Sequence, residues 1–133
     1  MSNKKNILIT GGAGFIGTNL AEELIKVGHA VTSIDDYSFG KKENEIAKVK
    51  YINDDIENIN IIKKPIDICF HLAAKARVQP SFENPMEYFR VNVQGTTKVM
   101  EWAKTNNVKV VYAGSSSKHF DPWDSPYAMY KYL

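Results

Sequence analysis

The feature that most constrains this chain is a glycine-rich segment near its start, Gly11-Gly12-Ala13-Gly14-Phe15-Ile16-Gly17. It follows an apolar run at 6–10 that is typical of a buried strand, and it opens a segment at 14–27 with apolar residues at helical spacing. Glycines leave backbone N–H groups bare at the positive end of a helix dipole, where a diphosphate can approach. The segment therefore predicts a dinucleotide cradle, in which Gly11 permits the tight turn, Gly14 the close approach and Gly17 the helix–strand packing. A glycine-rich turn without a ligand is the alternative.

Strands and helices alternate along the rest of the chain. Further strands are expected at 30–34, 49–52, 66–71 and 109–113. These segments lack polar alternation, as do strands that helices cover on both faces of a parallel sheet. The longest helix is expected at 85–106, and a last one begins after Ser125-Pro126. The order predicts an α/β fold: a Rossmann-type doubly wound parallel sheet of about five strands.

Two of the helices are expected to bury one apolar stripe each. The stripe of the first helix is Ile16, Leu20, Leu24 and Val27, and that of the longest is Met86, Phe89, Val93, Thr96, Met100 and Ala103. Gly28 stands in the position that ends the first helix. Cys69 lies in an apolar run and is interpreted as a core thiol.

The composition fits one globular domain. We expect residues 1–133 to form it, incomplete at the C-terminal end and cut before a substrate domain, because the last helix has barely begun. The 17 basic and 15 acidic residues are balanced, so neither a nucleic acid nor a membrane is the expected partner. A single cysteine excludes an internal disulfide. The chain lacks a signal-peptide pattern and an apolar stretch of membrane-spanning length, so we expect it in the cytoplasm. No metal site is expected, because His119 has no cluster of ligands around it.

Acidic residues at strand ends suggest which dinucleotide is bound. Asp35 ends the second strand, where a carboxylate can accept hydrogen bonds from both hydroxyls of an adenosine ribose. It would repel a 2′-phosphate, and no arginine lies nearby, so NAD is favoured over NADP. Asp55-Ile56 follows the third strand, where an adenine ring would lie. A surface acidic loop is the alternative for that pair.

Candidate reacting groups follow the fifth strand. Tyr127 and Lys131 stand four apart and share one face of a helix. A nearby ammonium favours a phenolate, which could take a proton from a substrate hydroxyl while hydride leaves the same carbon. One hydroxyl of Ser115, Ser116 and Ser117 could bind the reacting oxygen, and the spacing does not choose among them. His71 is interpreted as a strand-end histidine of the core.

Taken together, these residues resemble the NAD-dependent epimerase/dehydratase family of extended short-chain dehydrogenases. Beyond the segments above, the matches are His71-Leu72-Ala73-Ala74, Asn84-Pro85, Tyr88, Asn92-Val93-Gln94-Gly95-Thr96, Val110-Val111-Tyr112-Ala113 and Ser125-Pro126-Tyr127 to Lys131. The matches run in order over nearly the whole chain.

The resemblance implies the N-terminal portion of an enzyme similar to nucleotide-sugar epimerases, in which bound NAD transiently oxidises a sugar hydroxyl. It implies that Ser115, Tyr127 and Lys131 are catalytic. Residues expected at the cofactor are Gly11, Gly14, Phe15, Ile16, Gly17, Asp35, Asp55, Ile56, Leu72, Ala73, Ala74 and Asn92. It also implies a nucleotide-sugar substrate and a homodimer formed through the helices at 85–106 and 127–133.

The chain departs from the family pattern after the fifth strand. Ser116-Ser117 stand where the family's dehydratases usually have Asp-Glu, which favours epimerase-type chemistry over dehydration. Lys118-His119-Phe120 replace the usual Val-Tyr-Gly. The alternative to an enzyme is a dinucleotide-binding module, or a remnant, without catalytic activity.

Overall fold

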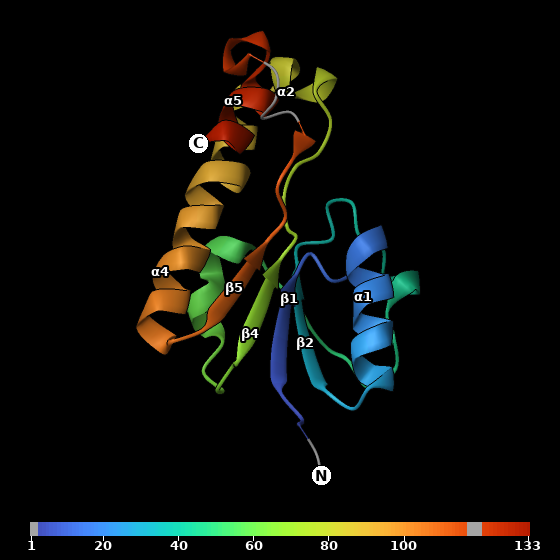
Figure 1. Cartoon of the computed structure of the whole chain (residues 1–133). Helices are drawn as coiled ribbons and strands as arrows, with labels where there is room; N and C mark the ends of the chain where they lie inside the picture. The colour runs from blue at the N-terminus through green and yellow to red at the C-terminus, as the bar shows by residue number, and fades with distance from the viewer. Residues whose placement is uncertain (1–2, 117–120) are drawn as a thin grey trace.

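A parallel sheet forms the centre of the computed structural model, which describes residues 3–116 and 121–133. Its strands are β1 (Asn6–Thr10), β2 (Ala30–Asp35), β3 (Lys50–Asn53), β4 (Ile68–His71) and β5 (Lys109–Tyr112). The five strands lie in the order β3-β2-β1-β4-β5, and all four neighbouring pairs are parallel (Figure 1). The Rossmann-type doubly wound sheet predicted from the sequence is confirmed.

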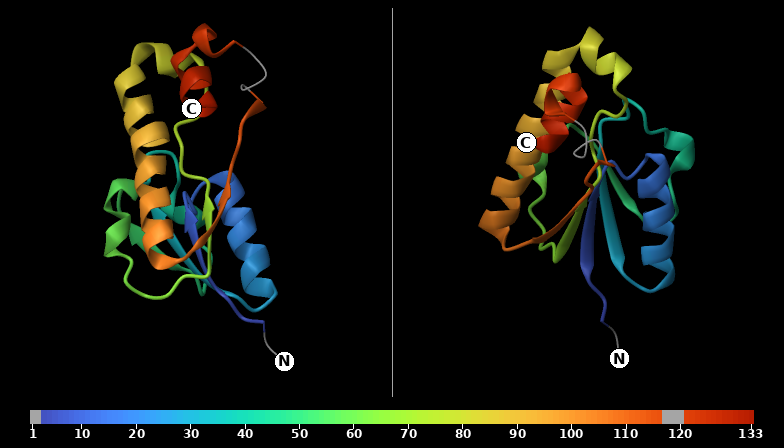
Figure 2. Two further views of the ribbon diagram at one scale, coloured as in Figure 1. Left: turned by 60° about the vertical axis from the view of Figure 1, so that its left-hand side comes forward. Right: turned by 45° about the horizontal axis from the view of Figure 1, so that its top comes forward.

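Helices cover both faces of the sheet. Helix α1 (Phe15–Lys26) lies on one face, and α4 (Thr96–Asn106) with the 3-10 segment η2 (Ile56–Ile61) lies on the other (Figure 2). Alternate residues of β1 serve the two sides: Ile7 and Ile9 pack in a cluster with Ala21, whereas Leu8 packs in a cluster with Val99 and Trp102. Burial on both faces explains why the strand sequences are apolar throughout.

The long helix predicted at 85–106 has the expected ends and an unexpected interior. It consists of α3 (Pro85–Phe89), the π-helical segment η3 (Arg90–Gly95) and α4. Asn107 closes it in the left-handed conformation, with φ of 54°. The predicted last helix is α5 (Pro126–Tyr132), and the Ser125 hydroxyl caps it by accepting a bond from Ala128 N at 3.0 Å.

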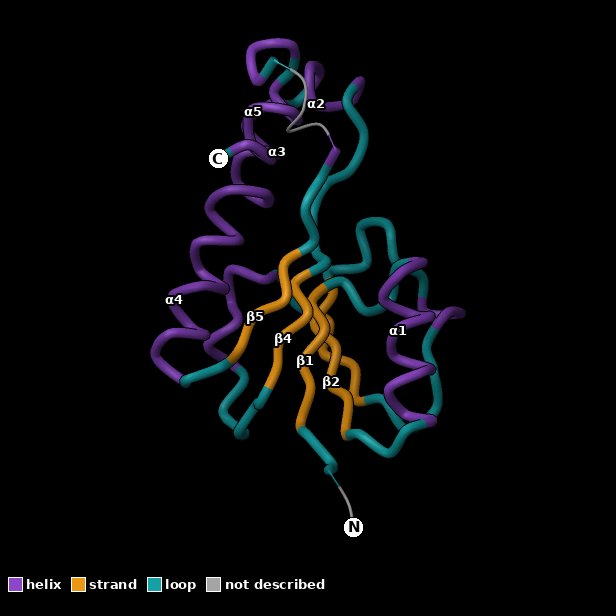
Figure 3. The backbone as a smooth tube through the Cα atoms, viewed as in Figure 1, coloured by secondary structure: helices purple, strands orange, loops and turns teal. Residues whose placement is uncertain are grey.

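Short elements that the sequence did not predict connect these parts. They are α2 (Gln79–Glu83), η1 (Lys42–Asn44), η2 and η5 (Pro122–Asp124). Helices α2, α3 and α5 gather beyond the carboxyl ends of the strands (Figure 3).

The predicted stripe of the long helix was largely wrong. Met86 is 71% exposed and Met100 is 38% exposed, and of the predicted set only Ala103 is buried. The face toward the core carries Tyr88, Val91, Asn92, Gly95, Val99 and Trp102 instead. The helix is apolar on two sides, and spacing alone does not say which side meets the sheet.

The stripe of α1 was wrong at both of its ends. Ile16 is 67% and Val27 69% exposed, whereas Gly17 and Ala21 are buried; Leu20 and Leu24 are partly buried as predicted. The first turn of the helix lies so close to the backbone of the strand–helix turn that only a glycine, Gly17, fits at the contact. Large residues at that end therefore point outward.

Two smaller predictions are confirmed. Gly28 follows α1 with φ of 96°, a conformation suited to glycine. Cys69 is fully buried, and burial raises the pKa of its thiol to about 12. Across the described residues, no helix combines the length and apolar character needed to span a bilayer.

Candidate functional site

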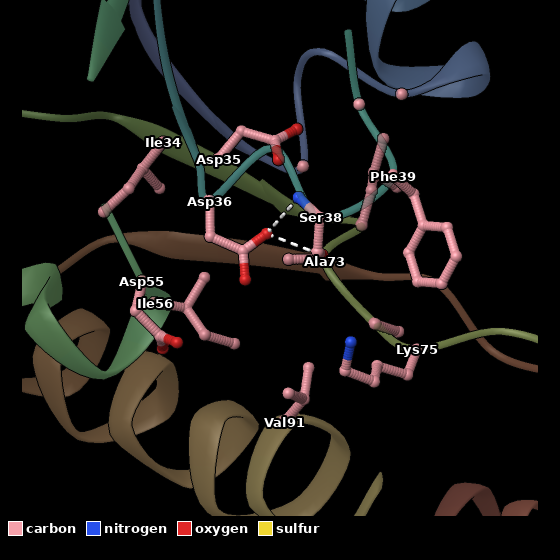
Figure 4. Close-up of a pocket in the computed structure, with 15 residues that line it drawn as sticks. Ile34, Asp35, Asp36, Ser38, Phe39, Asp55, Ile56, Ala73, Lys75 and Val91 are labelled. Carbon is pink, nitrogen blue, oxygen red and sulfur yellow. Dashed lines mark hydrogen bonds between the residues drawn. The ribbon is translucent and has the colours of Figure 1, made fainter. Parts of the chain in front are cut away.

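A cavity of about 140 Å³ opens at the carboxyl edge of the sheet. It lies where the strand order reverses between β1 and β4, which is where open α/β sheets bind ligands. Its lining comes from the end of β2, from the segments after β1, β2, β3 and β4, and from η3: Gly11, Gly14, Ile34, Asp35, Asp36, Ser38, Phe39, Gly40, Asp55, Ile56, Leu72, Ala73, Ala74, Lys75 and Val91 (Figure 4). Eight of the residues predicted at the cofactor are in this set.

The glycine segment forms an open cradle. Gly11 has φ of 76°, and a Cβ there would come within 3.0 Å of Ala73 N. Gly14 is the N-cap of α1, and no side chain caps the helix. A Cβ on Gly17 would lie 2.3 Å from Gly11 O, so only glycine lets the helix sit on the turn. The first amides of α1 are therefore unobstructed by side chains, as an anion site requires.

Asp35 is fixed beside this cradle. It is 8% exposed, and its two carboxylate oxygens accept hydrogen bonds from Ala13 N at 3.0 Å and from Tyr37 N at 2.8 Å. Each oxygen keeps a second lone pair for a ligand hydroxyl. The backbone of the cradle thus orients the carboxylate that the sequence assigned to the ribose.

The charges around the cavity are unequal. Asp35, Asp36 and Asp55 lie toward one side, while Lys75 points into the cavity from the segment after β4 (Figure 4). The Lys75 ammonium lies 5.1 Å from the centre of the Phe39 ring, so a cation–π contact joins the segment after β2 to the segment after β4. Lys75 is the one cationic side chain in the described lining, and it can meet a diphosphate. Neither Lys75 nor Phe39 was predicted from the sequence, although Lys75 directly follows the matched segment 71–74.

Four residues predicted at the cofactor do not line the cavity: Phe15, Ile16, Gly17 and Asn92. Phe15 and Ile16 have exposed side chains at the start of α1, where their amides would be the groups that serve a ligand. Asn92 is buried and acts on the cavity through the backbone. Its amide accepts from Lys75 N at 2.8 Å and donates to Lys75 O at 3.0 Å.

A buried hydrogen-bond network lies behind the cavity. Thr10 Oγ1 accepts from Leu72 N at 3.1 Å and Ala73 N at 3.0 Å, and it lies 2.7 Å from His71 Nδ1. Because both lone pairs of the hydroxyl are used, its proton goes to Nδ1. His71 Nε2–H therefore donates to Thr96 Oγ1 at 2.9 Å. His71 is neutral in this arrangement; burial, and then the charge of Lys131, lower its pKa to about 4.

The three predicted catalytic residues lie outside this cavity. Lys131 Nζ donates to Ala113 O at 3.1 Å, directly after β5, and lies 4.7 Å from the centre of the Tyr112 ring. The Tyr127 ring meets Tyr88 edge-on, with centres 6.4 Å apart. Ser115 follows β5 and is half-buried. Ser117 and Lys118-His119-Phe120 lie outside the described residues.

Comparisons with known proteins agree with this geometry. The sequence profile of the NAD dependent epimerase/dehydratase family matches residues 7–128. The chain belongs to this family. A UDP-N-acetyl-alpha-D-glucosaminuronate decarboxylase of Bacillus cytotoxicus is 39% identical over 119 residues, which cover 85% of this chain and 37% of that protein. NAD is the cofactor in the family's name, as Asp35 led us to expect.

Solved structures of other epimerases share the fold. An epimerase from Methanothermobacter thermautotrophicus superposes with a TM-score of 0.88 at 32% identity, covering 98% of this chain and 45% of its own. A UDP-glucose 4-epimerase from Brucella ovis, solved in complex with NAD, gives a TM-score of 0.86 at 27% identity, covering 96% and 45%. The chain spans less than half the length of each of these relatives.

Proposed function

We propose that this chain is the NAD-binding part of a nucleotide-sugar epimerase or a close relative that transiently oxidises a sugar hydroxyl. One observation carries the proposal: the open glycine cradle of α1 and the fixed carboxylate of Asp35 share a single cavity at the switch point of the sheet. The cradle suits a diphosphate, and the carboxylate suits the ribose diol beside it.

The described residues fit NAD along its adenosine half. The amides that open α1 and the ammonium of Lys75 would hold the diphosphate. Asp35 would accept from the ribose hydroxyls. The segment Asp55-Ile56 would face the adenine ring, since it forms the wall beyond Asp35 (Figure 4).

The proposed chemistry belongs to Ser115, which follows β5, and to Tyr127 and Lys131 of α5. When bound, NAD supplies the hydride acceptor. Tyr127 would take the proton of the sugar hydroxyl, and Ser115 would donate to the same oxygen. Lys131 uses one of its three donors on Ala113 O, so two remain for stabilising the phenolate and binding a ribose. These roles are supported by the family match and by the contact of Lys131 with Ala113, directly after β5.

The substrate we propose is a nucleotide-sugar. Among the relatives are UDP-glucose 4-epimerases and UDP-sugar decarboxylases, so the family match supports the class without choosing the reaction. Ser116, where a dehydratase would carry an acid, favours epimerisation over dehydration. A cytoplasmic location belongs to the same proposal and rests on the sequence.

We also propose a homodimer through the two helical segments 85–106 and 127–133. Both segments carry exposed apolar side chains: Met86 is 71%, Tyr132 62% and Leu133 76% exposed. Phe89 and Tyr130 join the two segments edge-on, with ring centres 5.6 Å apart. A second copy would cover this combined surface.

The experiment is turnover by the full-length protein on a panel of UDP-, GDP- and dTDP-sugars, with Tyr127→Phe as the inactive variant. Conversion of one sugar to its epimer, lost in the variant, is the expected result. Calorimetry with NAD and NADP runs beside it. NAD binding without turnover of any sugar would favour the binding module, and absence of binding would reject the proposal.

A further inference from the structure

Arg90, the first residue of the π-helical segment η3, binds three carboxylates. Its Nη1 donates to Asp55 Oδ2 and to Glu57 Oε2, both at 2.9 Å. Its Nε and Nη2 donate to the two oxygens of Glu87, at 2.9 and 2.7 Å. Asp55 and Glu57 belong to the start of η2, whereas Glu87 lies on the same helix as Arg90. The guanidinium therefore links η2 to that helix, and its two hydrogen bonds with Glu87 fix its orientation. We call Glu87 the brace of Arg90.

The other end of the π-helical turn touches the same part of η2. The Ile56 side chain lies over Gly95, where a Cβ would come within 2.4 Å of Ile56 Cδ1. A π-helical turn re-aims side chains within a helix and is frequent at functional sites. Here its first and last residues hold Asp55 and Ile56, the two residues that form one wall of the cavity.

The Asp55 carboxylate is held at both oxygens. Oδ1 accepts from Glu57 N at 2.9 Å, and Oδ2 accepts from Arg90. Each oxygen has one lone pair left, and the residue lines the cavity, so the carboxylate can still accept an N–H of a ligand. Its direction is set by Arg90.

We infer that Arg90 is a positioning residue that orients Asp55 toward the amino group of the adenine ring, and so makes the cavity selective for adenine. The inference rests on the proposed NAD binding. Arg90 itself does not line the cavity, and it acts through the two acidic residues of η2.

Charge and geometry both contribute to this role. Three carboxylates surround one guanidinium; they raise the pKa of Arg90, and Arg90 lowers the pKa of Glu87. Without the cation the carboxylates would repel one another, and the wall would open. A lysine would keep the charge but not the planar fork that holds Glu87 with two bonds while reaching Asp55. Arg90→Lys therefore separates geometry from charge.

The test compares NAD with nicotinamide hypoxanthine dinucleotide, which carries a carbonyl oxygen in place of the adenine amino group. Calorimetry on the full-length wild type should show a preference for NAD of about tenfold, the value of one hydrogen bond to a charged group. Arg90→Lys should lose most of that preference while its affinity for nicotinamide mononucleotide stays the same. Lys26→Gln, which removes an exposed ion pair with Glu23 on α1, is the control and should keep the preference.

Other outcomes separate the inference from the proposed function. Wild-type protein that binds both dinucleotides equally, or Arg90→Lys with an intact preference, would overturn the inference and leave NAD binding standing. A variant that weakens all three ligands alike would show a structural role only. Wild-type protein that binds no NAD would overturn the proposed function instead. Should Arg90→Lys not fold, Glu87→Gln removes the brace and should reduce the preference about threefold.

Discussion

The Thr10 hydroxyl donates its proton to Nδ1 of His71, 2.7 Å away, and neither side chain is more than 1% exposed. The same hydroxyl accepts a hydrogen bond from the backbone N–H of Ala73, a residue that lines the cavity. One buried hydroxyl thus links β1, β4 and the cofactor wall.

Thr10→Val should destabilise the fold by about 2 to 4 kcal/mol, because it leaves the Ala73 amide and His71 Nδ1 buried without partners. Urea denaturation measures the change in the free energy of unfolding. Thr10→Ser keeps the hydroxyl and should lose only about 1 kcal/mol for the missing methyl. Equal losses in both variants would mean that the network contributes nothing beyond packing.

Stability should fall as the pH drops from 6.5 to 4. The folded pKa of His71 is lowered to about 4 by burial and by Lys131, so its neutral form is favoured in the folded state. This contribution is complete above the unfolded pKa and is lost as the pH falls toward the folded one; it amounts to about 3 kcal/mol. His71→Gln should therefore show a flatter dependence in this window. Parallel curves for the two proteins would contradict the assignment.

Gly17→Ala should cost about 1 to 3 kcal/mol of stability and weaken NAD binding, because the new Cβ would lie 2.3 Å from Gly11 O and push α1 off its cradle. Thermal unfolding and calorimetry together measure both effects. Gly114→Ala is the matched control, since nothing lies within 4 Å of a Cβ there. A variant at Gly17 that matches this control would show that the cradle tolerates a side chain.

Asp35→Asn should lower the affinity for NAD by about tenfold, because the ribose loses a charged acceptor. The affinity for NADP should change less, so the ratio of the NAD affinity to the NADP affinity should decrease. Glu22→Gln is the control, because it removes an exposed carboxylate of α1 that does not line the cavity. An unchanged ratio in Asp35→Asn would place the ribose elsewhere.

Met100→Glu should shift the proposed homodimer toward monomer, because Met100 lies on the open apolar face of α4 and a buried charge there would lack a partner. Sedimentation at several concentrations measures the shift. Val27→Glu introduces the same charge at an exposed position beside α1 and should leave assembly unchanged. Wild-type protein that stays monomeric throughout would reject the homodimer.

The cradle could be predicted from the sequence because three local constraints coincide: a strand, glycines at the turn, and a helix. Asp35 was predictable because strand ends meet at one edge of a parallel sheet. The contact between Lys75 and Phe39 could not be predicted, because the two residues meet only after the segments that follow β2 and β4 have come together. The role of Arg90 could not be predicted for the same reason, because its partner Asp55 is 35 positions away in the sequence.

Helix faces were less predictable than helix ends. Proline, asparagine and glycine mark helix ends locally, and the predicted ends at 85 and 106 are confirmed. The choice between two apolar faces depends on where neighbouring elements lie. The π-helical turn adds to this, because it changes the phase of every residue beyond it.

Strands β1 and β4 pair at the centre of the sheet although they lie far apart in the sequence. Thr10 aligns with His71, so the two strands that flank the switch point are separated by 61 positions. Closing so long a loop costs more conformational entropy than the shorter parallel crossover from β1 to β2 or from β4 to β5. The cavity at the switch point is therefore complete only after β4 has paired with β1, because Leu72, Ala73 and Ala74 supply part of its lining.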